Sequence, residues 1–299
     1  CLQILVLNFD MFLEKIIFKN IKKSFKNSWS FFSWKKFQFF FGLSILSIVI
    51  FSALLAPLLP IDPDEMRFDL IVSPPSKQHY LGTDSFGRDI LSRTIYGARV
   101  SLRVGFVAVI LALSMGLPIG LLSGYMGGLT DAILMRLADA LLAFPAILLA
   151  VAFIGILGPG ETSVMLGLGI VYTPIFARVA RAKVLSIREL DYIKAAKSIG
   201  ASEFRIICLH LLPNAIGPVI VQVTVAFAFA IIAEAGMSFL GLGTQPPTPS
   251  WGLMLAEARP YIQQSTWYPL VPGIVLTIVV LSVTIVGDRL REILDPHSN

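Results

Sequence analysis

Residues 191–214, DYIKAAKSIGASEFRIICLHLLPN, form a polar and basic island between long apolar runs, and this stretch decides the fold. It predicts two short helices separated at Gly200, because glycine can take the left-handed conformation that ends a helix. Ser202 can cap the second helix, which we expect to run from Glu203 toward Leu212. The first helix carries apolar residues at three-residue spacing beside basic ones, which is typical of an amphipathic helix at a membrane surface. We therefore expect a water-facing pair of helices, and we call residues 191–214 the knob.

The composition of the chain is that of a polytopic membrane protein. Of the 299 residues, 56% are hydrophobic and only 14% are charged, whereas about a quarter of the residues are charged in a typical soluble domain. Two cysteines, Cys1 and Cys208, cannot build a disulfide framework or a metal cluster, so we expect Cys208 to be reduced. The net charge of +5 could reflect nucleic acid, anionic lipid or membrane topology. The positions of the charges favour topology, and we expect no nucleic-acid partner.

An all-α fold with six transmembrane helices is predicted from six uncharged runs. The hydrocarbon core is roughly 30 Å thick, and about 20 apolar residues in a helix cross it. We expect the spans at residues 37–60, 104–130, 140–160, 162–177, 211–233 and 261–287. Glycines at four-residue intervals in the second span would let a neighbouring helix approach closely. These glycines are Gly116, Gly120, Gly124 and Gly128.

Both ends of the chain are expected in the cytoplasm. Residues 1–10 precede Met11, which would make a natural start of translation. We expect residues 1–36 to be a basic flank that its charge holds in the cytoplasm, in preference to an arm that binds nucleic acid. Residues 291–299 are expected to form a cytoplasmic tail. The basic flank contains Lys15, Lys19, Lys22, Lys23, Lys26, Lys35 and Lys36.

Residues 61–98 form a polar segment, extracytoplasmic or interfacial, that follows the first span. Its prolines make the first part extended, and its acidic residues balance its basic ones. We expect Thr83 or Asp84 to cap a helix whose arginines lie near the lipid headgroups. Such a helix would seat the first span against the other helices, a role that we prefer to direct contact with substrate. The arginines concerned are Arg88, Arg93 and Arg99.

Two strings of residues carry a resemblance to a known family. Part of the knob resembles the EAA loop, through which the membrane subunits of bacterial ABC importers dock on a separate ATPase. The residues matched to that loop are Lys194, which replaces its glutamate, Ala195, Ala196, Gly200, Leu212 and Pro213, and His210 replaces a later isoleucine. The string LGTDSFGRD resembles a signature of the C-type permease subunits of dipeptide and oligopeptide importers. Its signature residues are Gly82, Thr83, Asp84, Gly87, Arg88 and Asp89.

The resemblance implies the type I ABC importer permease fold, with a five-helix core at residues 99–290 and a coupling loop at residues 186–213. It also implies a complex in the bacterial inner membrane. The partners would be a homologous permease subunit in a heterodimer, ABC ATPase subunits and an extracytoplasmic substrate-binding protein. The cargo would be short peptides, with nickel or another small solute as the alternative.

Basic residues gather on one side of the expected spans. That side holds the lysines of residues 1–36, the basic residues from Arg178 to Arg205, and two arginines after the sixth span. Cytoplasmic loops of membrane proteins carry the excess of lysine and arginine. Both termini and the knob are therefore expected in the cytoplasm, where ATP is.

The chain is not expected to be an enzyme. The P-loop pattern G-x-x-x-x-G-K-[ST], which cradles nucleotide phosphates, does not occur in it, and no cofactor or metal site is indicated. Energy for transport would reach the chain through the knob from a partner. The alternative from a different class is a membrane scaffold whose knob binds some other partner.

Ionisable residues within the expected spans are few, which disfavours coupling to a proton or sodium gradient. Glu234, at the end of the fifth span, is the acidic residue that we would test for contact with the transport pathway, although pairing between helices is the preferred role. Asp139 is expected to pair with Arg136 or with the basic loop. The proline-rich stretch 241–260 would form an outer loop, with Trp251 anchored at the headgroups.

Overall fold

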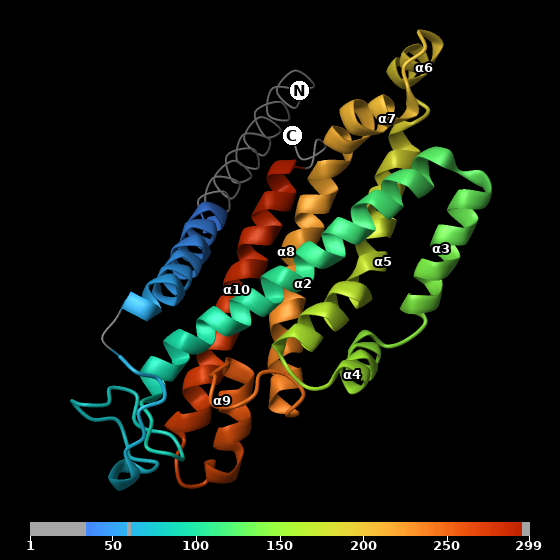
Figure 1. Ribbon diagram of the computed structural model, residues 1–299. Coiled ribbons are helices and arrows are strands. Elements are labelled where there is room, and N and C mark those ends of the chain that lie inside the picture. Colours follow the sequence, from blue (N-terminus) through green and yellow to red (C-terminus); the bar gives the residue numbers. More distant parts are fainter. Residues whose placement is uncertain (1–33, 59–60, 295–299) are drawn as a thin grey trace, which may run out of the picture.

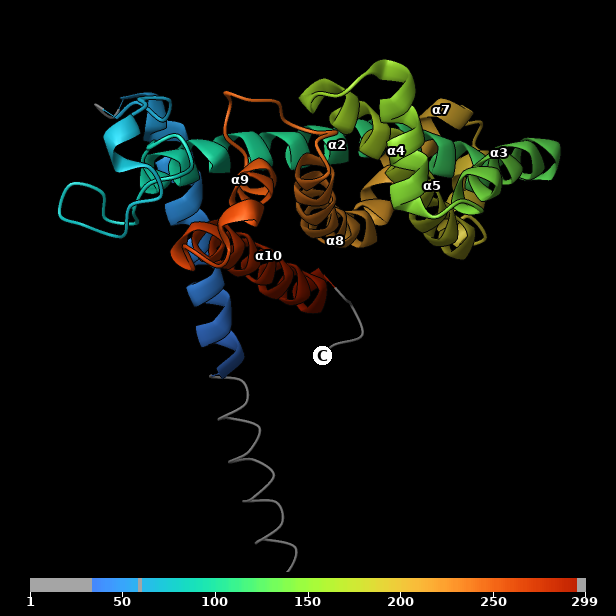
Figure 2. The ribbon, with the colours of Figure 1, turned by 90° about the horizontal axis from the view of Figure 1, so that it is seen from below.

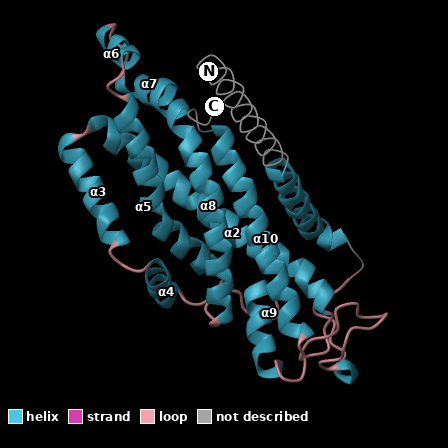
Figure 3. Cartoon of the chain, turned by 180° about the vertical axis from the view of Figure 1, so that it is seen from behind, coloured by secondary structure: helices cyan, strands magenta, loops and turns pink. Residues whose placement is uncertain are grey.

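The computed structural model describes residues 34–58 and 61–294, and in these residues the chain is all-α without a named β-strand (Figure 3). The expected fold class is thus confirmed. The proposed start at Met11, the lysines before Trp34 and the last residues of the expected tail, 295–299, lie outside the described residues.

In the described part of the chain, five helices are long and apolar enough to cross a membrane, and a bent pair makes a sixth span if it is counted as one. The expected number of six agrees with this arrangement. The single helices are Trp34–Leu58, α2 (Ile90–Met126), α5 (Glu161–Ile187), Glu203–Phe239, which contains α7 and α8, and α10 (Trp267–Leu294). The short elements outside these helices are η2 (Phe68–Leu70), α6 (Asp191–Ser198), α9 (Trp251–Ala258) and η4 (Arg259–Tyr261).

The expected third span, 140–160, is wrong as a single helix. The structure has instead α3 (Gly128–Leu142) and α4 (Ala146–Leu157), which are bent by 89° relative to each other. Pro145 stands at the N-cap of α4 with extended backbone. Proline has no N–H to continue a helix and disfavours helical backbone at the residue before it. The break therefore falls at this proline, inside an uninterrupted apolar run.

The helix α2 begins earlier than the sequence indicates. Its N-cap is Asp89, whose carboxylate accepts a hydrogen bond from the Ser92 backbone N–H at 2.8 Å. Residues 90–98 of the expected polar segment are consequently helical. The two residues expected to cap this helix lie in the loop before it, and they are Thr83 and Asp84.

The glycines of α2 lie against α5, as their spacing predicts. A Cβ atom built on Gly120 would come within 2.3 Å of the Ala177 carbonyl oxygen, and Cβ atoms on Gly116 and Gly124 would come within 2.4 Å and 2.8 Å of atoms of α5. Gly128 does not belong to this contact, because it starts α3 and a Cβ there would meet nothing within 4 Å. The close approach of α2 and α5 forms the centre of the core.

The two ends of the molecule carry different features. The knob, the start of the first helix and the end of α10 lie at one end, whereas α4, α9 and residues 61–89 lie at the other (Figure 1). An ion pair between Lys35 and Glu292 joins the first helix to α10 at the knob end. Figure 2 shows that the first helix lies outside the bundle of the other helices. A functional site could therefore lie at the knob end or at the end that carries α4, α9 and residues 61–89.

Candidate functional site: the knob and the opposite end

The knob begins with α6 and α7 (Glu203–Ile206), and Gly200 lies between them at a φ of +82°. Residues with a Cβ rarely adopt this conformation, whereas glycine adopts it without strain. The Ser202 hydroxyl accepts a hydrogen bond from the Arg205 N–H at 3.4 Å and caps α7. The expected break at glycine and the expected cap are both confirmed.

The underside of the knob packs on the end of α2. Ile193 and Ala196 are buried in one cluster with Leu121. The Lys197 ammonium lies 4.7 Å from the centroid of the Tyr125 ring, a cation–π contact. These contacts fix the orientation of α6 on the bundle, so the knob cannot turn independently of α2.

The outer face of the knob is partly apolar. Ile199 and Phe204 are 86% and 78% exposed, and Leu209 is exposed as well. The resemblance to the EAA loop did not indicate these residues, because that motif is defined mainly by small side chains. They are nevertheless visible in the sequence as apolar residues within a polar stretch. Of the matched residues, Lys194, Ala195, Gly200 and Pro213 are exposed, Leu212 is half-buried and Ala196 is buried.

The knob continues directly into a membrane-spanning helix. Between α7 and α8 (Leu212–Phe239) lies η3 (Ile207–Leu211), a turn of π-helix, and the whole helix runs unbroken from Glu203 to Phe239. The Asn214 side-chain amide donates to the His210 carbonyl oxygen at 2.7 Å. Because no loop intervenes, a displacement of α7 is passed to α8.

Ion pairs hold α3 beside α5 near the knob. The Arg181 guanidinium donates two hydrogen bonds of 2.6 Å to the Asp131 carboxylate, which also accepts one from the Ser123 hydroxyl. Asp139 pairs with Arg178 at 2.5 Å, so its partner is one of the basic residues from Arg178 to Arg205, which the sequence left open as an alternative to Arg136, and this residue lies in α5 and not in a loop.

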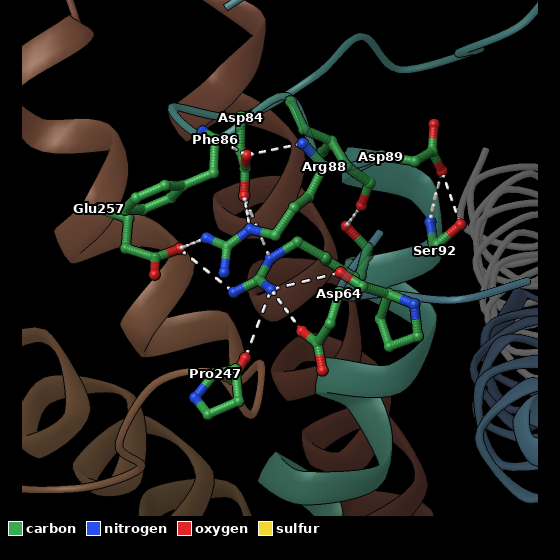
Figure 4. A network of polar contacts seen from close by, with 12 residues as sticks. Asp64, Asp84, Phe86, Arg88, Asp89, Ser92, Pro247 and Glu257 are labelled. Atoms are coloured by element: carbon green, nitrogen blue, oxygen red, sulfur yellow. Dashed lines mark hydrogen bonds and ion pairs between the residues drawn. The ribbon is translucent and has the colours of Figure 1, made fainter. Parts of the chain in front are cut away.

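A buried cluster of charged side chains lies at the opposite end (Figure 4). Arg88 donates to Asp84 at 2.6 Å and to Glu257 at 3.1 Å, and Arg93 donates to the same Glu257 oxygen at 3.2 Å and to Asp64 at 3.2 Å. Burial lowers the pKa of the Arg88 guanidinium, but the Asp84 and Glu257 carboxylates outweigh it, so this pKa lies above its usual value. The cluster ties residues 61–89 and α9 to α2.

The expectation that Arg88 and Arg93 lie near the headgroups is therefore wrong. Their exposed fractions are 2% and 0%, whereas Arg99 is exposed. A guanidinium can be buried where carboxylates and carbonyls accept its hydrogen bonds. Glu257 stands 169 positions from Arg88 in the chain, so no local pattern indicates this pairing.

The other signature residues shape a tight turn before α2. Asp89 caps that helix and also accepts a contact from His79 Nδ1 at 2.9 Å. The Thr83 hydroxyl accepts from the Ser73 N–H at 2.9 Å. Gly87 has a φ of +73°, and a Cβ there would lie 1.8 Å from the Arg67 carbonyl oxygen. The signature therefore encodes a compact turn that only glycine at this position permits.

Glu234 and Trp251 lie inside the protein near that end. Glu234 is 1% exposed, its Oε1 accepts from the Ser238 hydroxyl at 2.7 Å, and its Oε2 has no hydrogen-bond partner in the described part of the chain. The expected headgroup anchor, Trp251, is fully buried, and its indole N–H donates to the Thr94 carbonyl oxygen at 3.1 Å. That expectation is wrong because α9 folds back onto α2, where Gly97 leaves room for the indole ring.

The fold and these two regions define a polytopic helical permease. Residues 116–299 match the family described as binding-protein-dependent transport system inner membrane component. The chain belongs to this family.

Curated relatives resemble the chain over most of its length. The dipeptide transport system permease protein DppC of Alkalihalophilus pseudofirmus is 46% identical over 85% of this chain and 84% of its own length. The di/tripeptide transport system permease protein DppC of Pseudomonas aeruginosa is 43% identical over 85% of this chain and 86% of its own. A putative peptide transport system permease protein of Brucella suis is 44% identical over 87% and 88% of the two chains.

Solved structures share the fold at low sequence identity. A chain of the MetNI methionine ABC transporter in an inward-facing conformation superposes with a TM-score of 0.57 at 21% identity, and the match covers 68% of this chain and 96% of that chain. A chain of an amino acid ABC transporter gives a TM-score of 0.53 at 16% identity, with 68% and 94% covered. The fold is thus the type I ABC importer permease fold.

Proposed function

We propose that this chain is a permease subunit of an ABC importer that moves dipeptides and oligopeptides into the cytoplasm. The observation that carries the proposal is the similarity, at 43–46% identity and over about 85% of the chain, to permeases named for dipeptide and tripeptide transport. The knob at one end and the signature turn at the other support it, since each fits a part of such a subunit.

The knob is proposed to receive movement from ATPase subunits. Its small exposed residues, Ala195 and Gly200, let a partner approach closely, and Ile199 and Phe204 can enter an apolar cleft. Lys194 lies exposed on the same helix. ATP hydrolysis is assigned to the partner subunits, because the chain contains no P-loop pattern.

Further matched residues would hold the knob in place. Ala196 would do so by packing against the bundle, and Leu212 and Pro213 by joining the knob to α8 without a loop. Glu234 is a candidate pathway residue that is buried in this conformation, so it would contact cargo only after the helices around it separate.

The chain is proposed to lie in the bacterial inner membrane with both termini and the knob in the cytoplasm. We retain the division into residues 1–36, 37–60, 61–98, 99–290 and 291–299 as a functional one. A homologous permease subunit would complete a heterodimer, and an extracytoplasmic binding protein would deliver the cargo. Closure of the ATPase pair would move the two knobs together and turn the permease outward, and hydrolysis would reset it.

The test is purification of the chain through a C-terminal tag from its own membranes, followed by mass spectrometry. We expect a homologous permease and an ABC ATPase, and ATPase activity that a dipeptide-loaded binding protein stimulates. Recovery of the intact chain without an ATPase, even after cross-linking through a Ser198→Cys substitution, would favour the scaffold alternative. Stimulation by nickel, and not by dipeptides, would move the cargo to the other alternative.

A further inference from the structure

Residues 61–89 expose large apolar side chains at the end of the molecule opposite the knob (Figure 1). Phe68 is 68% exposed and Tyr80 is 71% exposed. Others that are exposed in the same segment are Met66, Ile71 and Phe86. Clustered exposed apolar residues rimmed by polar ones are typical of surfaces that bind another molecule.

The segment that carries these side chains is firmly held. Its turn is fixed to α9 by the contact of Arg88 with Glu257 and to α2 by the contact of Asp84 with Arg93. The Thr83 hydroxyl donates to the Leu70 carbonyl oxygen, which anchors the part of the segment that bears Phe68. A preformed surface loses little conformational entropy when a partner binds to it.

A cavity of about 280 Å³ opens beside Tyr80. It is lined by the carboxylates of Asp62, Glu65 and Asp89 and by the guanidinium of Arg67, which pairs with Glu65 at 2.9 Å. Three carboxylates against one guanidinium make the cavity anionic. Among the residues that the structure describes, no group of His, Cys, Asp and Glu side chains is arranged to hold a metal ion.

A buried histidine in the wall of this cavity contacts one of these carboxylates. His79 is 9% exposed, and its Nδ1 lies 2.9 Å from the Asp89 carboxylate. Because an ionised carboxylate only accepts, Nδ1 carries a proton and donates it to Asp89. Nε2 is buried and has no hydrogen-bond partner among the described residues. The carboxylates of the cavity suit a cationic donor, namely a lysine ammonium or an arginine guanidinium.

We propose that residues 61–89 are a docking surface for the extracytoplasmic binding protein, and that a lysine or arginine of that protein enters the cavity. The proposal rests on the proposed function, which places this end of the molecule outside the cytoplasm. The exposed acidic residues Asp62, Glu65 and Asp69 repel anionic headgroups, so a basic protein surface fits better than a membrane. Tyr80 and Phe68 would then form the apolar rim of the contact.

The test uses the complete complex in nanodiscs of zwitterionic lipid, with ATPase activity measured against the concentration of its dipeptide-loaded binding protein. Glu65→Lys reverses a charge that lines the cavity, and we expect it to raise the half-saturating concentration of binding protein at least tenfold. Asp69→Lys makes the same charge change on the same segment outside the cavity, so it separates the effect of the cavity from that of the charge on the surrounding surface. We expect it to raise that concentration less than Glu65→Lys does. If the loaded binding protein does not stimulate the ATPase activity of the wild-type complex, this result counts against the proposed function, whatever the variants do.

Direct contact is tested by a photo-crosslinking amino acid in place of Tyr80. We expect a crosslink to the binding protein that disappears in excess unlabelled binding protein. A crosslink only to lipid, or a loss of maximal rate at an unchanged half-saturating concentration, would overturn the docking surface, and equal effects of the two lysine substitutions would overturn the role of the cavity. Each of these outcomes would leave the importer assignment standing.

Discussion

Gly120 shows how a single missing side chain sets the contact between α2 and α5. The predicted effect of Gly120→Ala is a loss of packing, because the new methyl would lie 2.3 Å from the Ala177 carbonyl oxygen. Overpacking of this kind costs about 1–3 kcal/mol. We expect less folded protein in membranes and a lower midpoint of thermal unfolding. The control is Gly155→Ala, where nothing lies within 4 Å of the new methyl. Equal behaviour of the two variants would contradict the role of the glycine contact.

Glu257 neutralises two buried arginines at once. Truncation by Glu257→Ala leaves Arg88 and Arg93 with fewer acceptors inside the protein. Breaking a buried ion pair in this way costs about 3–5 kcal/mol. We expect thermal inactivation of the purified complex at a clearly lower temperature, with Asp69→Ala on the exposed part of residues 61–89 as the control. A midpoint equal to that of the control would show that the cluster contributes little to stability.

Residue-level prediction from the sequence succeeded where one position decides the outcome. The positive φ of Gly200 and the cap at Ser202 follow from local chemistry. The burial of Arg88 and Arg93 could not be predicted, because it depends on Glu257, which is distant in the chain and adjacent only after folding. A charged residue next to an apolar run is expected at the membrane interface unless the oppositely charged residue that pairs with it is known.

The turn between α6 and α7 is an element in which backbone conformation, not space, limits the choice of residue. Nothing lies within 4 Å of a Cβ built on Gly200, yet its φ is +82°. A β-branched residue is strained there by about 1–2 kcal/mol. We expect Gly200→Val to lower peptide uptake while ATP hydrolysis continues, and Gly200→Asn to be milder, since asparagine tolerates this conformation. Normal uptake by the valine variant at normal expression would refute the coupling role.

Element boundaries were less predictable than the elements themselves. Hydropathy located five of the six apolar runs as helices but did not locate the 89° bend between α3 and α4. An apolar run indicates burial or lipid contact without indicating direction, and Pro145 was visible in the sequence but was assigned to a continuous span. The sequence predicted a helix in the polar segment but not that it is continuous with the second span, because the polar residues in the first turns of α2 are buried against protein.

For the molecule as a whole, the positions of the basic residues predict the topology. In a chain whose native cysteines are replaced by serine, Ser198→Cys should react with a membrane-impermeant maleimide only after the membrane is opened. Lys77→Cys should react with the same maleimide in cells whose outer layer is removed but whose inner membrane is intact, because residues 61–89 lie at the end opposite the knob. The reverse pattern would invert the proposed orientation. Equal labelling of both positions in intact cells would contradict a spanning bundle between them.

The π turn between α7 and α8 has a consequence for the evolution of the family. A π turn, such as η3 at Ile207–Leu211, contains one more residue than the α-helical path that it replaces. A relative without that turn should be one residue shorter between the positions of Ser202 and Pro213. Since each residue of an α-helix turns the chain by about 100°, its α7 would present a different face to the ATPase. A single-residue gap in a comparison of sequences would thus mark a change in how permease and ATPase meet.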